Sequence, residues 1–439
     1  MKKVTYLLFV YSLTTSSTQA ETLTEEIKHT LQTNPDVLIN LSSRRAVDEE
    51  LNQTFAGYLP TIELTGGIGK EISENSTTHA KYADGESDLT RRELGLSLSQ
   101  MLFDGFNVAY GVEQQQFRVN SSAYRVRNTN ENIALRTVEV YLEILRRKHL
   151  QELARNNVVI HQKILEQIRL VVDSGAGRKA DVQQSQSRLS LAESVLVTSE
   201  GNVRDAESNY LRVTGKMPKD LQEPAPEIVT NALPKSVEAA IDTALAQHAA
   251  LKAVKAELSA TEAQHKQTDS SFMPSLFLEL GATDNNNIDG ITGKNSDMTA
   301  MLKMRYNLYR GGADQARRRE TAERVGVAKE TIVKTQRMIE EETRMAWNEL
   351  ATTRQRLKHL EQHTEFSNQV LDSYKEQFKL GQRSLLDVLD SENELFNARS
   401  ASATAKYVEL LAIFRVLAST GTLLATLNIK PPKEAEIQY

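Results

Sequence analysis

The chain carries Leu98-Ser99-Gln100-Met101-Leu102-Phe103-Asp104-Gly105, and the end of this stretch returns as Leu308-Tyr309-Arg310-Gly311 after 206 residues. The same spacing separates Gly175 from Gly381 and Thr214 from Thr420. Solenoid proteins repeat units of roughly 20 to 50 residues, so a unit of this length is a whole structural half that has been duplicated and fused. The sequence therefore predicts two internal repeats, residues 21–215 and 236–421.

Alternating apolar and polar residues lead into both copies of this stretch. They predict a pair of strands in each repeat, at residues 61–70 and 93–103 and again at 275–283 and 298–309. Each strand has close to the ~9 to 11 residues that cross a bilayer at a tilt. Four strands cannot close a barrel, yet backbone groups in lipid must all be paired. We therefore expect three chains to supply an even twelve strands.

Long helices follow the strands, because no proline lies between residues 61 and 217 or between 275 and 430. We expect an outgoing helix at about 107–172 and another at about 313–380. Glycine-containing breaks end both, since glycine supplies the left-handed turn of a helix C-terminus. Returning helices are then expected at 181–213 and 385–418. The proline-rich segment 216–235 and the C-terminal segment 422–439 are expected to form an irregular band halfway along the helices.

The second outgoing helix shows a coiled-coil seam with a period of 3.5 residues. Its positions are Ile339, Thr343, Ala346, Leu350, Thr353, Leu357, Leu360, Thr364, Ser367, Leu371, Tyr374 and Phe378. Many of them are small or polar, and the opposite faces are charged. This composition favours helices in the wall of a hollow, water-filled cylinder; the alternative is an ordinary coiled-coil stalk. The fold class is thus a mixed α/β membrane protein with four transmembrane strands per chain and a long helical barrel.

The composition limits the compartment and the partners. Residues 1–20 have two lysines, a short apolar stretch and a small-residue cleavage site, as in an export signal peptide; a short N-terminal anchor is the alternative. The 439 residues include no cysteine, which excludes disulfides and thiol chemistry. With 53 basic and 58 acidic residues the net charge is −5, so nucleic acid is not an expected partner.

The ordered, duplicated motifs resemble those of the TolC-like outer-membrane channel proteins over essentially the whole mature chain. Leu98 to Gly105 is similar to the family's strand-to-helix junction, and Gly175 to Val182 and Gly381 to Asp390 are similar to its periplasmic turns. The resemblance implies a homotrimer in the outer membrane, in contact with its lipid, whose helical part lies in the periplasm. It also implies a passive exit duct that works with a periplasmic adaptor and an inner-membrane transporter. The stretch from Gly177 to Leu189 is most similar to the type I secretion and agglutination branch, which implies an ABC transporter and an exported protein such as a large adhesin.

The resemblance also implies roles for residues at the helical turns. Gly175, Gly177 and Gly381 fall in the turns themselves. The other matching positions form the family's gate and pore constriction: Asp181, Phe378, Arg383, Asp387 and Asp390. Phe378 stands where the family has a tyrosine that donates a hydrogen bond to an aspartate, so here it is expected to close the gate by packing.

Alternatives remain for the site and for the function. Asp181 and Asp387 follow helix breaks, where a carboxylate also stabilises a helix N-terminus. A drug-efflux duct is the alternative within the same class, and a trimeric surface adhesin is one from another class. We expect no enzyme, because no catalytic constellation occurs in the sequence. We likewise expect no metal site and no cofactor.

Overall fold

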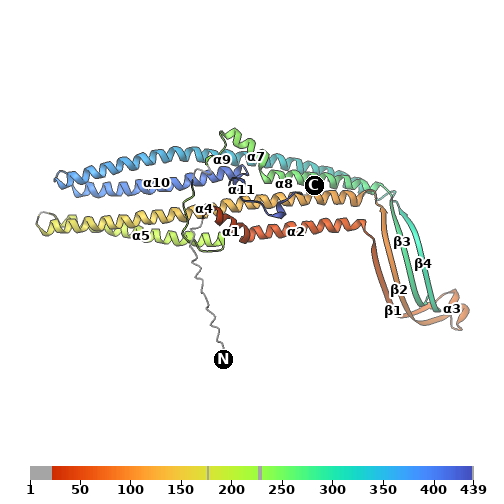
Figure 1. Ribbon diagram of the computed structural model, residues 1–439. Coiled ribbons are helices and arrows are strands. Elements are labelled where there is room, and N and C mark those ends of the chain that lie inside the picture. The colour runs from red at the N-terminus through yellow and green to blue at the C-terminus, as the bar shows by residue number, and fades with distance from the viewer. Residues whose placement is uncertain (1–21, 176, 226–229, 438–439) are drawn as a thin grey trace, which may run out of the picture.

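A computed structural model describes residues 22–175, 177–225 and 230–437. The predicted signal peptide at 1–20 lies outside the described residues. The chain is elongated, with a sheet at one end and two helical turns at the opposite end (Figure 1). None of the helices in the described ranges combines the length and the hydropathy that a bilayer crossing requires.

The sheet has four antiparallel strands in the order β1-β2-β3-β4. They are β1 (Thr61–Glu74), β2 (Glu86–Phe103), β3 (Ser275–Ile288) and β4 (Ile291–Arg305). The register places Leu98 of β2 opposite both Ile62 of β1 and Leu280 of β3, so apolar residues from successive strands share one face. The prediction of two hairpins, one from each repeat, is confirmed. In the chain by itself β1 and β4 are edge strands.

All four strands run further outward than the alternation predicts. β1 reaches Glu74 and β2 begins at Glu86, and the polar stretch between them contains a short helix, α3 (Ser76–Lys81). β3 extends to Ile288, and β4 runs from Ile291 to Arg305 rather than from 298 to 309. Polar residues continue a strand wherever their backbone groups are paired, and such pairing produces no apolar alternation. The sequence therefore understated the strand lengths at their outer ends.

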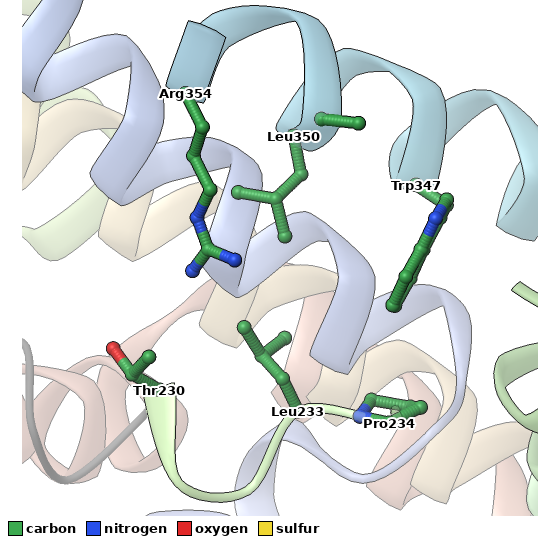
Figure 2. A pocket seen from close by; sticks show the side chains of 7 residues that line it. Thr230, Leu233, Pro234, Trp347, Leu350 and Arg354 are labelled. Atoms are coloured by element: carbon green, nitrogen blue, oxygen red, sulfur yellow. The ribbon is translucent and has the colours of Figure 1, made fainter. Parts of the chain in front are cut away.

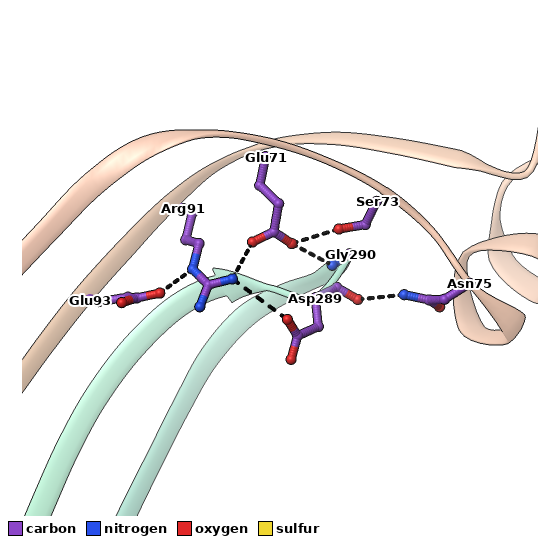
Figure 3. A network of polar contacts seen from close by, with 7 residues as sticks. All are labelled: Glu71, Ser73, Asn75, Arg91, Glu93, Asp289 and Gly290. Carbon is purple, nitrogen blue, oxygen red and sulfur yellow. Dashed lines mark hydrogen bonds and ion pairs between the residues drawn. The ribbon is translucent and has the colours of Figure 1, made fainter.

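Polar contacts join the outer ends of the two hairpins (Figure 3). The Arg91 guanidinium pairs with the carboxylates of Glu71, at 2.5 Å, and of Glu93. Glu71 also accepts a hydrogen bond from the backbone N–H of Gly290, and the Asn75 side chain donates to the Asp289 carbonyl at 3.0 Å. These bonds attach the loop that contains α3 to the β3–β4 turn.

The strand-to-helix junctions explain the duplicated motif. Gly105 and Phe106 have φ values of 68° and 67°, and Gly311 and Gly312 have 64° and 83°. Two successive left-handed residues turn the chain from the sheet into a long helix, and glycine adopts this conformation without steric cost. The Asp104 carboxylate then accepts a hydrogen bond from the backbone N–H of Val108 at 2.7 Å, at the first turn of the first helix.

The helices form two unequal hairpins. Each outgoing helix, α4 (Asn107–Asp173) and α9 (Ala313–Lys379), has 67 residues and is therefore ~100 Å long. The returning helices α5 (Lys179–Thr214) and α10 (Leu385–Ser419) are about half as long. The remaining length is filled by shorter elements: α1 (Leu23–Thr33), α2 (Pro35–Phe55), η1 (Ala56–Tyr58), α7 (Val237–Gln247), α8 (Ala249–Gln267) and η2 (Thr268–Phe272).

The predicted seam of α9 faces its neighbours. All twelve seam positions from Ile339 to Phe378 are buried or partly buried, whereas most of the intervening residues are exposed. Heptad spacing therefore identified the packed face correctly even where the side chain is threonine or serine.

The largest apolar core lies at the middle of the molecule, where all four long helices meet. Tyr141, Tyr210 and Phe414 are almost fully buried there. The C-terminal segment, with α11 (Leu423–Thr426) and η3 (Lys433–Ala435), packs against the same region. On another side, Leu233 and Pro234 approach Trp347 and leave a cavity of about 230 Å³ (Figure 2).

Candidate functional site: the helical tips

Two glycine turns form the tips. Gly175 ends α4 with φ +83°, and Gly381 ends α9 with φ +72°. The Gly381 N–H donates to the Phe378 carbonyl at 3.0 Å, as in a helix C-terminal cap. At Gly177 an added Cβ would lie 2.6 Å from the Val172 side chain, so this glycine is required by close contact and not by a left-handed backbone. Ala176 lies outside the described residues.

Asp387 lies in the first turn of α10 and forms a capping box with Ser384. The Ser384 hydroxyl donates to the Asp387 carboxylate at 2.8 Å, and the Asp387 N–H donates to the same hydroxyl oxygen at 3.3 Å. Hydrogen bonds from the Ser384 side chain and then from its backbone lower the pKa of Asp387. In this chain Asp387 therefore stabilises a helix N-terminus.

Arg383 contacts groups of its own hairpin. Its Nε donates to the Gln377 side chain at 2.9 Å, and its guanidinium lies 4.1 Å from the centre of the Tyr374 ring. The Asp387 carboxylate is 3.9 Å away. These contacts hold the arginine over the α9–α10 turn.

Asp390 contacts the other hairpin. Its carboxylate accepts a hydrogen bond from Arg188 of α5 at 2.6 Å. The sequence did not point to Arg188 as a partner of Asp390. The 206-residue offset contains the missing signal: Arg188 corresponds to residue 394, which is one helical turn from Asp390, so the two lie at nearly the same height in parallel hairpins.

Apolar contacts reinforce this connection between the hairpins. Ile168 of α4 packs with Leu385 and Leu389 of α10, and Phe378 borders this cluster. Phe378 also borders a second cluster within its own hairpin, formed by Leu371, Val388 and Leu395. The Phe378 ring has no hydroxyl group to donate a hydrogen bond, and it packs against apolar side chains instead. Asp181 lies in the first turn of α5, partly buried, and its carboxylate has no hydrogen-bond partner among the residues that the structure describes.

A buried group of ionisable side chains lies just above the tips, and no pattern in the sequence predicted it. Glu392 of α10 is 3% exposed and its carboxylate lies 2.6 Å from Lys375 of α9. His161 of α4 faces Glu392 and Arg188, and burial lowers its pKa while the Glu392 charge opposes that effect. All four long helices thus place an ionisable group at this height.

Comparisons with known proteins cover nearly the whole chain. BepC, an outer membrane efflux protein of Brucella suis, is 26% identical over 415 residues, which are 94% of this chain and 88% of BepC. The outer membrane protein TolC of Vibrio cholerae is 24% identical, with 96% of each chain covered. The proteases secretion protein PrtF of Dickeya chrysanthemi is 24% identical over 96% of this chain and 93% of its own.

The fold is also found in a solved structure. The outer-membrane channel OprN superimposes with a TM-score of 0.76 at 16% identity, over 91% of this chain and 89% of OprN. The sequence profile of the family described as "Outer membrane efflux protein" matches residues 27–216 and 240–422, which are the two repeats. The chain therefore belongs to the outer membrane efflux protein family.

Proposed function

We propose that three copies of this chain form an exit duct through the outer membrane for a protein exported by type I secretion. Members of this family are outer-membrane channels and not enzymes. The open sheet is the main evidence for this assembly. Strands β1 and β4 are both edges of the sheet, and the apolar face of the sheet is exposed. An open edge in lipid leaves backbone groups unpaired, so β4 of one copy must pair with β1 of the next. Three copies give twelve strands and a closed barrel.

The helices support the same assembly, because several of them expose apolar side chains. On α9 these are Val327, Met338, Met345 and Phe366, and on α2 and α5 they are Ile39, Leu191 and Val197. Exposed apolar residues spread over ~60 Å of helix are an extended surface for another copy. The helices then continue the barrel as a tunnel through the periplasm.

The tips are the gate in this proposal, with Asp181, Phe378, Arg383, Asp387 and Asp390 around the constriction. The Arg188–Asp390 bond and the Ile168–Leu389 contact hold the two hairpins of one chain together. Opening the tunnel separates the hairpins and breaks both contacts. A periplasmic adaptor and an inner-membrane ABC transporter supply the docking and the energy, since the chain carries no nucleotide-binding motif.

Two sequence features favour protein as the substrate: the segment Gly177 to Leu189, which resembles the type I secretion branch, and the similarity to the protease secretion protein PrtF. The alternative is drug efflux, and BepC is named as an efflux protein.

A deletion strain separates these two functions. If the channel secretes a protein, we expect the deletion strain to lose a large protein from the culture supernatant, and the wild-type gene to restore it. The sensitivity of the strain to dyes and detergents should be unchanged. Increased sensitivity with an unaltered set of secreted proteins would contradict protein secretion and support efflux.

A further inference from the structure

The apolar face of the sheet marks where the membrane ends on the helix side. Ile62, Leu64 and Ile68 share this face and are 68%, 71% and 76% exposed. Where the strands meet the helices, aromatic side chains gather: Phe55, Tyr58, Phe103, Phe106, Tyr110, Phe272, Tyr306 and Tyr309. Aromatic residues of membrane proteins concentrate at the level of the lipid headgroups. The start of α9 therefore lies at the headgroups of the leaflet that faces the periplasm.

Arginines accumulate at this level in the second repeat alone. Residues 305–319 contain five arginines and one acidic residue, Asp314. The corresponding residues of the first repeat, 99–113, contain no basic residue and two acidic ones, Asp104 and Glu113. Because the two junctions have the same backbone geometry, the fold does not require this charge. Within the chain, Arg310 pairs with Asp314 and Arg318 with Asp269, each at 3.2 Å.

A groove at the second junction exposes two of these arginines. It has a volume of about 520 Å³, within the range of small-molecule pockets, and is lined by His265, Phe272, Gln315, Arg318, Arg319 and Ala322. Arg318 is 56% exposed and lies 3.2 Å from Asp269. Arg319 is exposed and forms no ion pair with any residue in the described parts of the chain. We call it the junction groove.

We propose that the junction groove binds the phosphate group of an anionic phospholipid of the periplasm-facing leaflet. Guanidinium groups present a planar fork that donates two hydrogen bonds to one phosphate, and Arg318 and Arg319 are adjacent in sequence at the groove. The Phe272 ring gives the groove an apolar wall against which the glycerol and the upper acyl chains pack. Phe272 is also one of the aromatic residues at the strand-to-helix level, so the groove lies at that level.

A second copy of the chain is the competing occupant. Glu49 and Glu50 are exposed on α2, which ends at Phe55 before β1 begins at Thr61. In the proposed assembly β1 is the edge that meets β4 of the next copy. They could pair with Arg317, which also lies on α9. The side of α9 separates the two cases: Arg318 and Ala322 line the groove next to α8, whereas in the proposed assembly a neighbouring copy would contact the side of α9 that faces away from α8. Arg318 and Arg319 are therefore the arginines assigned to lipid binding.

The test uses the full-length protein in nanodiscs of phosphatidylethanolamine with one fifth phosphatidylglycerol. Lipids that remain bound after extraction are counted by native mass spectrometry. Each arginine near an anionic surface contributes about a fivefold preference. The wild type should therefore retain phosphatidylglycerol well above its share of the bilayer, and the R318Q/R319Q variant should retain it at that share. The R324Q/R337Q variant removes the same charge lower on α9 and should behave as the wild type.

A lysine variant and the oligomeric state of the glutamine variant distinguish lipid binding from contact with a second copy. The R318K/R319K variant preserves charge but loses the guanidinium forks, so it should fall between the wild type and the glutamine variant. Equal enrichment of phosphatidylglycerol in the wild type and in R318Q/R319Q would overturn the proposal. So would dissociation of R318Q/R319Q into single chains with its lipid preference unchanged, which would assign the arginines to contact with a second copy.

Discussion

Arg188 and Asp390 show how much a single pair can contribute at the tip. The two side chains are 29% and 57% exposed, so their bond is worth about 1 kcal/mol at most. A gate needs contacts of this strength, because a much stronger one would hold it closed. The bond matters through its position between two hairpins, whereas the contacts of Arg383 lie within one.

Arg188→Ala should therefore raise the conductance of the resting channel in planar bilayers. Arg383→Ala serves as the control within the chain and should have the smaller effect. A larger leak in Arg383→Ala than in Arg188→Ala would show that Arg383 bonds to another copy and that the Arg188–Asp390 pair is not part of the gate.

Glu131 makes the attachment of the C-terminal segment depend on pH. Its carboxylate accepts hydrogen bonds from the backbone N–H of Leu424 at 3.3 to 3.4 Å, and burial raises its pKa to about 7. The ordinary value is 4.5, so between these two values the folded state binds more protons than the unfolded state. Stability from this group is therefore full below pH 4.5 and is lost as the pH rises through 7.

Glu131→Gln should remove this pH dependence while keeping an acceptor for the backbone N–H. At pH 8 the variant should be more stable than the wild type by about 1 to 3 kcal/mol, and at pH 5 the two should be nearly equal. Thermal unfolding followed by circular dichroism at both pH values measures the difference. A variant that is less stable than the wild type at pH 8 would show that the ionised carboxylate is stabilising.

The sequence predicted the tips only in part, for a physical reason. Asp387 follows a helix break, and that spacing suits both a capping residue and a pore residue; the structure places it in the capping box. Whether it also lines a constriction depends on neighbouring copies, so that role stays a prediction. Arg188 was missed because its bond to Asp390 joins two hairpins, and sequence patterns report contacts within one helix more readily than contacts between helices.

The long helices were predicted well from the sequence. The absence of proline reflects local backbone geometry, and the heptad spacing reflects a single packed face. The sheet was predicted less completely. The apolar alternation ends before the strands do, because β1 continues to Glu74 and β3 to Ile288. Beyond the membrane, strand pairing depends on contacts between hairpins such as the Glu71–Gly290 bond. Such contacts leave no period in the sequence.

The α9–α10 turn depends on the left-handed conformation of Gly381. An added Cβ there meets no atom within 4 Å, so Gly381→Ala costs only backbone strain, about 1 kcal/mol. Gly326 provides the matched control, because it lies inside α9 with equally open surroundings. Gly326→Ala should stabilise the protein by about 0.5 to 1 kcal/mol. Thermal unfolding of both variants should show shifts of opposite sign, and equal shifts would mean that the turn does not require glycine.

The whole molecule consists of two repeats that together do not form a closed sheet. Each repeat supplies two strands and one unequal helical hairpin, and two repeats still leave an open sheet with an exposed apolar face. The repeats differ at the tips, where Ser384 and Asp387 cap only α10, and at the membrane boundary, where the arginines belong only to the second. An assembly of identical chains therefore alternates two kinds of contact around its axis.

In the proposed assembly β4 of one copy pairs with β1 of the next. The natural chain has no cysteine, so introduced pairs report this contact without background. Glu63→Cys on β1 is combined in turn with Thr299→Cys, Met301→Cys or Lys303→Cys on β4, all on the polar face of the sheet. Within one chain these positions lie on opposite edges, too far apart for a disulfide. We expect a covalent trimer on a non-reducing gel for the pair in register and none for any single-cysteine variant. Single chains alone for every pair would contradict it.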